Sequence, residues 1–149
     1  MILHLKTAVA QNYIAILEGF DRDLFKALSP LFPRLKIIRF DGSMPGDRVE
    51  IELQAGPLRQ RWTSLITERQ VTDQAAWFTD QGQELPPPLR FWRHQHLVTK
   101  EQGHSCIHDI IEFKTGARLL DLLVYPVLYF QFKQRAPIYR RVFGHVVKS

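Results

Sequence analysis

The sequence predicts an α+β domain in which a curved antiparallel sheet of about seven strands wraps around a long C-terminal helix. Three observations predict this class. Most of the chain alternates between apolar and polar residues in short segments, which is the period of half-buried strands. Short turns join most of these segments, so consecutive strands must pair antiparallel. After Gly116 the period changes to that of an amphipathic helix.

The beginning of the chain contains one strand and two short helices. Residues 2–9 alternate and predict the first strand. Apolar residues then recur at helical spacing in two groups, which predict helices near 12–18 and 21–28. Ser29-Pro30 ends the second helix, because proline cannot continue the hydrogen-bond ladder.

Six further strands follow, separated by turn residues such as Asp41–Asp47 and Pro86-Pro87-Pro88. Their expected ranges are Leu35–Phe40, Arg48–Leu53, Arg59–Arg69, Gln74–Asp80, Phe91–Val98 and Ser105–Phe113. The meander they form leaves no room for crossover helices.

A helix stripe ends the sequence. Its residues recur every three to four positions and are Leu128, Phe132, Ala136, Tyr139 and Phe143. Pro126 fits the first turn of this helix, and Pro137 should kink it. The stripe must be buried, and the concave face of the sheet is the expected place.

Length and composition exclude several classes of protein. The 149 residues are the size of one domain, so we expect a single domain over 1–149. A single cysteine, Cys106, excludes an intramolecular disulfide and a cysteine-rich zinc site. The N-terminus does not resemble a secretory signal, which predicts a cytoplasmic protein. Glycine-rich nucleotide-binding loops and the common hydrolase motifs are absent, and we expect no cofactor.

The net charge of +5 permits an anionic partner without requiring one. The basic residues near the C-terminus are Lys133, Arg135, Arg140, Arg141 and Lys148. We interpret them as the solvated side of the last helix, with at most weak peripheral contact with a membrane and no nucleic acid as partner. Leu119–Phe132 is too short and too polar to span a bilayer, so integral membrane association is not expected. Arg59, Arg61 and Arg69 are assigned to the outer face of their strand.

Strand periodicity sorts the side chains of the sheet by face. Trp62, Phe78, Trp92, Ile111 and Phe113 mark the face with the largest apolar residues, which is therefore assigned inward. Four titratable residues share that face, namely Asp80, His94, His96 and Asp109. Adjacent antiparallel strands bring such residues to within about 5 Å between Cβ atoms.

This cluster has four interpretations. It can be a structural network in which the histidines and carboxylates form hydrogen bonds with one another. It can recognise the polar end of a ligand in an apolar cavity. It can supply a histidine oriented by an aspartate for general acid–base catalysis. It can bind a metal, although this face lacks a clear third histidine or cysteine, so we predict no metal site.

Several motifs of the chain resemble the SRPBCC superfamily, whose members have the START-like or helix-grip fold. They are Phe25 with Leu28–Pro33, Trp62, Phe78–Asp80, Leu89 with Trp92–His96, Asp109–Phe113, and Phe132 with Arg135. The chain is most similar to the uncharacterised ligand-binding branch related to polyketide cyclase/dehydrase and coenzyme Q-binding proteins. The resemblance implies a hydrophobic cavity between sheet and helix, but this fold hosts many chemistries.

We therefore expect a small hydrophobic ligand, such as a lipid, isoprenoid, polyketide-like or aromatic molecule. The residues expected to contact it are Trp62, Phe78, Asp80, Trp92, His94, His96, Asp109, Ile111, Phe113, Leu128 and Phe132. One alternative is a cyclase/dehydratase-like enzyme that uses a His–Asp pair from the same four polar residues. The other is a non-catalytic protein whose interior is filled by its own side chains.

Overall fold

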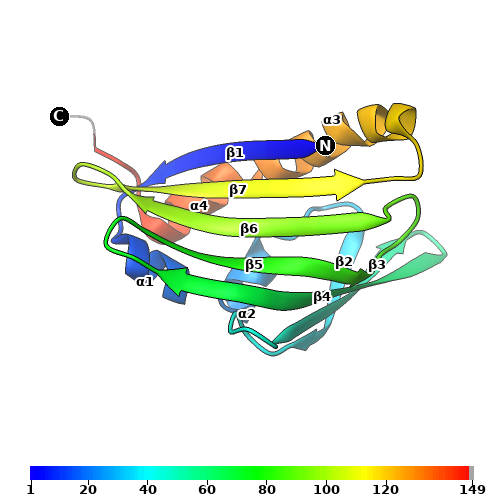
Figure 1. Cartoon of the computed structure of the whole chain (residues 1–149), viewed down its shortest axis with the longest axis horizontal. Helices are drawn as coiled ribbons and strands as arrows, with labels where there is room; N and C mark the ends of the chain where they lie inside the picture. Colours follow the sequence, from blue (N-terminus) through cyan, green and yellow to red (C-terminus); the bar gives the residue numbers. More distant parts are fainter. Residues whose placement is uncertain (148–149) are drawn as a thin grey trace.

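The structure is a computed structural model that describes residues 1–147, and over this range it contains seven strands and four helices (Figure 1). In chain order they are β1 (Ile2–Val9), α1 (Tyr13–Glu18), α2 (Arg22–Ala27), β2 (Arg34–Phe40), β3 (Arg48–Ala55), β4 (Leu58–Val71), β5 (Ala75–Glu84), β6 (Phe91–Lys100), β7 (Ser105–Lys114), α3 (Arg118–Lys133) and α4 (Arg135–Phe143). Lys148, the last of the basic residues considered above, lies outside the described residues.

The strands form one antiparallel sheet in the order β1-β7-β6-β5-β4-β3-β2. Strands β2 to β7 thus pair with their neighbours in sequence, and β1 closes the other edge by pairing with β7. Both short helices begin at a capping residue. Asn12 accepts a hydrogen bond from the backbone N–H of Ile14, and Asp21 accepts one from Leu24. The predicted fold class is confirmed.

The C-terminal helix is interrupted, and its break differs from the expected kink. Helix α3 ends at Lys133 and α4 begins at Arg135, so the two share Gln134 as a boundary. Pro137 cannot donate a hydrogen bond to the carbonyl of Lys133, and its ring crowds that carbonyl, so the helix ends one turn before the proline. Pro126 lies in the interior of α3 rather than in its first turn.

Two β-bulges interrupt the pairing of β4 with β5: the first adds Gln83 to β5, and the second adds Thr67 to β4 and changes the alternation of that strand. The pairing of β4 with β5 shifts between Thr63 and Ser64 and again between Ile66 and Glu68. A bulge adds one unpaired residue, so the side chains beyond it change faces. Arg69 therefore pairs with Phe78 and shares its inner face, where it donates a hydrogen bond to Ser43 Oγ at 2.7 Å. The assignment of Arg69 to the outer face was wrong.

All four helices pack on one face of the sheet (Figure 1). The core between the sheet and the helices consists of two apolar clusters. Helices α1, α2 and α4 cover one cluster, which includes Phe78 and Val98. Helix α3 covers the other, which includes Trp92 and Phe113. On β6 the two histidines His94 and His96 lie between the two clusters. The polar residues thus form a layer inside the core, where they must form hydrogen bonds with one another.

The longest helix, α3, has 16 residues. Among the described residues, no helix is both long enough and apolar enough to cross a membrane.

Candidate functional site

The four polar residues of the inner face lie on three adjacent strands. Asp80 on β5 is directly opposite His94 on β6, and His96 is directly opposite Asp109 on β7. Asp109 and His94 are both 3% exposed, and His96 is 9% exposed. The structure thus brings together all four residues that the sequence places on this face.

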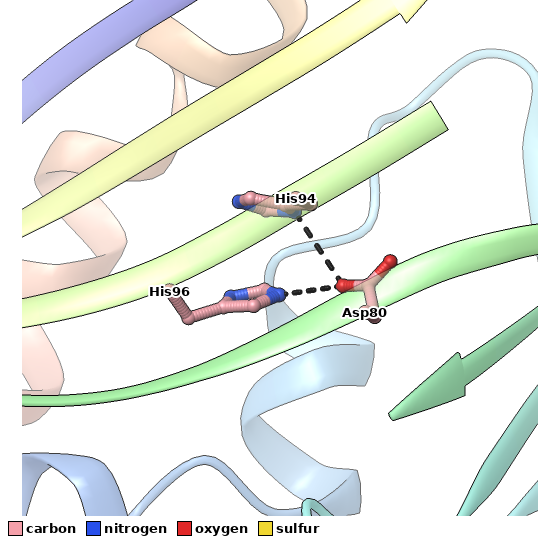
Figure 2. A group of neighbouring side chains, drawn as sticks. All are labelled: Asp80, His94 and His96. Carbon is pink, nitrogen blue, oxygen red and sulfur yellow. Dashed lines mark hydrogen bonds and ion pairs between the residues drawn. The ribbon is translucent and has the colours of Figure 1, made fainter. Parts of the chain in front are cut away.

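The hydrogen bonds follow the diagonals rather than the direct pairs. His96 Nε2 lies 2.8 Å from Asp80 Oδ2, and His94 Nε2 lies 2.8 Å from Asp109 Oδ1. Figure 2 shows Asp80 facing both imidazoles, with His94 Nδ1 at the longer distance of 3.8 Å from Asp80 Oδ2. The two rings lie against each other, with centroids 3.7 Å apart. Each histidine is therefore oriented by a different carboxylate.

Helix α4 supplies two further members of the network. The Tyr139 hydroxyl donates to Asp109 Oδ2 at 3.0 Å, and Arg135 Nη1 lies 3.5 Å from Asp109 Oδ1. Arg135 also stacks on the ring of Phe132, with its guanidinium carbon 4.3 Å from the centroid. Asp109 is thus the hub of the cluster and has three partners.

Sequence reasoning missed the roles of both α4 residues. The Arg135 side chain is 13% exposed and is not on the solvated side of the helix, because the break at Gln134 sets α4 in its own orientation. Tyr139 was counted as part of the apolar stripe. A buried tyrosine hydroxyl normally needs a hydrogen-bond partner, and this was the available signal that Tyr139 faces a polar group.

The protonation states follow from burial and from these contacts. Burial alone would raise the pKa of Asp109, but the hydrogen bond from His94 and the charge of Arg135 lower it below its usual range. The pKa of Asp80 is also lowered, because the bond from His96 and the charge of His94 outweigh its burial. Both groups are therefore carboxylates at neutral pH. Burial and the Asp109 charge raise the pKa of Tyr139, which remains a neutral donor.

His96 is a neutral imidazole in the folded protein. Burial and the neighbouring His94 lower its pKa to about 4, although Asp80 opposes this shift. Because the Asp80 carboxylate can only accept, His96 Nε2 must carry the ring proton. Nδ1 is then left as an acceptor. It is buried and has no hydrogen-bond partner among the described residues.

A cavity of about 230 Å³ lies beside this network, between the sheet and the helices. The predicted ligand residues that line it are Trp62, Phe78, Asp80, Trp92, His94, His96, Leu128 and Phe132. Asp109, Ile111 and Phe113 face the same side of the sheet but lie outside the lining, covered by other side chains. Asp109 reaches the cavity only through His94 and Arg135.

The opposite wall of the cavity comes from parts of the chain to which sequence reasoning gave no site role. It includes Phe20, Leu28, Phe40, Ile51 and Leu53, from α2 and its flanking segments and from β2 and β3. Their apolar side chains on short elements signal burial, but they do not signal whether the space they enclose is filled. Arg135 and Gln131 also line the cavity, at the ends of the two C-terminal helices.

The group formed by Asp80, His94 and His96 has the donor types of a metal site, with ligand atoms within 4.8 Å of one another. Two features favour a hydrogen-bonded network over a metal site. His96 Nε2 already bonds to Asp80, and the cation of Arg135 lies in the same network, where it disfavours a second cation.

Comparison with known proteins gives similarity in structure alone. No family model matches the chain, and no curated protein matches it. A solved structure of protein Ms6760 from Mycobacterium smegmatis is similar with a TM-score of 0.66 and 15% identity, over 99% of this chain and 93% of the other. Truncated norcoclaurine synthase from Thalictrum flavum gives a TM-score of 0.66 and 16% identity, over 98% and 95%.

The Zhui aromatase/cyclase from Streptomyces sp. R1128 is similar with a TM-score of 0.58 and 15% identity, over 98% of this chain and 99% of the other. At these TM-scores, over nearly the whole chain, the three structures share its fold. The chain has the helix-grip fold, the fold that its sequence motifs imply. At such identities the similarity establishes the fold and leaves the chemistry to the site itself.

Proposed function

We propose that the chain binds a small, largely apolar molecule in the cavity and holds its one polar group at the His–Asp network. The observation that carries this proposal is the composition of the cavity wall. Aromatic and aliphatic side chains make up most of it, and the polar side chains of Asp80, His94, His96 and Arg135 meet at one region. An apolar pocket with a few convergent polar groups is the usual design of a small-molecule site.

The volume of the cavity limits the size of the ligand. A protein cavity of about 150 Å³ accommodates benzene. The 230 Å³ found in this protein therefore suits one or two fused rings, or an aliphatic chain of similar volume. The same empty volume argues against the alternative in which the interior is filled by its own side chains.

The unpaired nitrogen of His96 defines the chemistry of the polar group. His96 lines the cavity, but its Nδ1 is covered by other atoms. A buried acceptor without a partner costs about 1–3 kcal/mol, and a ligand that reaches Nδ1 after a small side-chain shift recovers this cost by donating a hydrogen bond. His96 Nδ1 can only accept, so the proposed ligand carries a donor such as a phenolic, enolic or alcoholic hydroxyl. The low pKa of His96 makes it a weak base at neutral pH, which favours hydrogen bonding over proton removal at this residue.

Binding of 2-naphthol and of 2-methoxynaphthalene tests both parts of this proposal. The two probes have similar ring systems, but only 2-naphthol can donate a hydrogen bond. We expect the full-length protein to bind both by calorimetry, with 2-naphthol bound about tenfold more tightly, the worth of one good hydrogen bond. Equal affinities would refute the role of His96 Nδ1, and no binding of either probe would refute the cavity as a site.

Two variants of strand β2 separate cavity binding from adhesion to the surface. Leu35 lines the cavity, whereas Ile38, on the same strand, is exposed. Leu35→Trp should fill the cavity and weaken binding of either probe about tenfold or more. Ile38→Trp should bind as the wild type does. If both variants bind equally well, the probes do not occupy the cavity. Native mass spectrometry of the purified protein would then show whether another molecule accompanies it.

His94 supports a second candidate function, an acid–base enzyme of the cyclase/dehydratase type. Its Nε2 is held by Asp109, while the residue lines the cavity, and a histidine oriented by a carboxylate is the usual general acid–base pair. Dehydration would require removal of a proton next to a carbonyl and protonation of the departing hydroxyl, which leaves as water. The probe 4-hydroxy-4-phenylbutan-2-one tests this step, because its enone product absorbs in the ultraviolet.

Turnover of that probe should fall at least 100-fold in His94→Ala if His94 transfers the proton, with probe binding retained. A matched His108→Ala variant alters a histidine of the outer sheet face and should leave turnover unchanged. Equal rates in the wild type and His94→Ala would restrict the function to binding.

A further inference from the structure

The outer surface of α3 is apolar along its whole length. Five large apolar residues on this surface are each between 55% and 71% exposed, namely Leu119, Leu122, Leu123, Val127 and Phe130. The opposite side of the same helix packs into the core through Leu128 and its neighbours. A helix at a protein–water boundary normally carries polar residues on its outer side, so an apolar outer side indicates that something covers it.

The exposed charges of α3 have one sign. Arg118 and Lys133 lie at the two ends of α3 and are exposed. The only acidic residue of the helix, Asp121, is turned toward Thr115, whose backbone N–H and hydroxyl both donate to it at 2.6 Å. Helix α4 adds the exposed residues Arg140 and Arg141. The apolar surface is therefore bordered by cations that are free to meet an anionic partner.

A second group of exposed apolar side chains lies across the cavity from α3. Leu31 is 95% exposed and Phe32 is 68% exposed, in the segment between α2 and β2. Their neighbours Pro30 and Pro33 line the cavity. On the helix side, Leu128 and Gln131 line the cavity next to the exposed residues Val127 and Phe130. Exposed apolar groups thus border the cavity on two of its walls.

We infer that this surface, made by the outer side of α3 and by Leu31 and Phe32, docks on a lipid bilayer that contains anionic headgroups. An amphipathic surface element of this kind inserts its apolar side chains to the level of the headgroups while its cations pair with phosphate groups. Docking would turn the cavity wall between Leu31 and Phe130 toward the membrane.

The charge pattern favours a bilayer over a second copy of the chain. In a twofold dimer built on α3, antiparallel helices place Arg118 of one copy beside Lys133 of the other, and parallel helices place identical cations together. Either arrangement brings like charges into contact, which opposes association. Lipid phosphates pair with the cations at both ends of the helix. Docking on vesicles does not require an occupied cavity, so it stands apart from ligand binding.

Sedimentation with vesicles tests the inference. The full-length protein should bind vesicles of phosphatidylcholine with phosphatidylglycerol, bind pure phosphatidylcholine much less, and lose binding as salt is raised. Leu123→Gln combined with Phe130→Gln should weaken vesicle binding by about tenfold or more, since both side chains lose apolar contact. A matched double variant, Ile2→Gln with Val71→Gln, removes exposed apolar residues from the sheet and should bind as the wild type does.

Three results would overturn the inference. They are no binding to anionic vesicles, equal weakening by both double variants, and a dimer in sedimentation equilibrium that Leu123→Gln with Phe130→Gln abolishes. The last result would assign the surface to a second copy of the chain. The cavity-filling variant Leu35→Trp keeps the two proposals separate. Docking predicts that it binds vesicles normally, and the cavity proposal predicts that it loses 2-naphthol.

Discussion

At the scale of single residues, Asp109 organises the candidate site although it does not line the cavity. It accepts hydrogen bonds from His94 at 2.8 Å and from Tyr139 at 3.0 Å, and it faces Arg135 at 3.5 Å. A buried carboxylate of this kind balances the charge of the guanidinium and fixes the ring of the histidine. Its contribution should therefore appear in stability as well as in binding.

The first prediction compares two aspartates. Asp109→Asn should lower the free energy of unfolding by about 3 kcal/mol or more, because it removes the carboxylate that is paired with the buried Arg135. Asp80→Asn should cost less, since the side chain of Asp80 is more exposed and, among the described residues, its one close bond is to His96. Urea unfolding of both variants measures the difference. Equal losses would show that Asp109 is not the hub of the network.

Tyr139 provides a second prediction at this scale. Tyr139→Phe removes the hydroxyl that donates to Asp109 and leaves the buried ring in place. The loss should be about 1–3 kcal/mol, the usual cost of a missing buried hydrogen bond. Tyr129→Phe on α3 is a matched control, because Tyr129 is only partly buried against the core, and it should change the unfolding free energy by less than about 0.5 kcal/mol.

The sequence was sufficient to place the four polar residues of the sheet, because strand alternation is unbroken around them on β5, β6 and β7. It could not determine which histidine bonds to which aspartate. Direct and diagonal neighbours on paired strands are both within reach of these side chains, and the choice depends on ring rotation. The position of Arg135 was also beyond sequence reasoning, since it depends on the orientation of α4 after the break at Gln134.

At the scale of elements, local sequence signals predicted the strands and the two short helices. The departures came from irregularities inside elements. The bulge near Ile66 moved Arg69 to the inner face, and Pro137 ended α3 a full turn before its own position. A bulge has no reliable signal in one sequence, because an added residue in a strand changes only its pairing with the neighbour.

The contact between α1 and α4 gives a prediction at this scale. Gly19 ends α1 in a right-handed helical conformation, so alanine is conformationally allowed and by propensity alone would stabilise the protein. A Cβ atom at Gly19 would, however, lie 2.8 Å from Cε1 of Phe143, which is 3% exposed in the core. The steric cost of this contact should exceed the gain from propensity. Gly19→Ala should therefore lower the free energy of unfolding by about 1–3 kcal/mol.

Calorimetry of Gly19→Ala measures this effect, and a double variant identifies its cause. Phe143→Leu by itself should destabilise the protein. In the Phe143→Leu background, Gly19→Ala should cost much less than in the wild type, because the close contact is gone. A stabilised Gly19→Ala protein would mean that α1 and α4 do not pack as closely as the structure shows.

At the scale of the whole molecule, the polar layer between two apolar clusters couples folding to pH. His96 is buried and neutral in the fold, with a pKa of about 4 against an ordinary value of 6.5. The unfolded chain therefore binds more protons than the folded chain between these two values, and stability falls as pH is lowered through this window. His108 contributes in the same direction, because burial and the charge of His4 lower its pKa.

The expected loss from His96 between pH 7 and pH 4 is about 3 kcal/mol. Below pH 4 the loss continues, because the folded carboxylates of Asp80 and Asp109 have lowered pKa values and the unfolded chain takes up protons first. Urea unfolding at a series of pH values measures this profile. His96→Gln should flatten the profile between pH 6.5 and 4 while keeping the decline below pH 4. A variant profile as steep as that of the wild type would place the titrating group elsewhere and would remove the neutral His96 on which the proposed recognition of a hydroxyl depends.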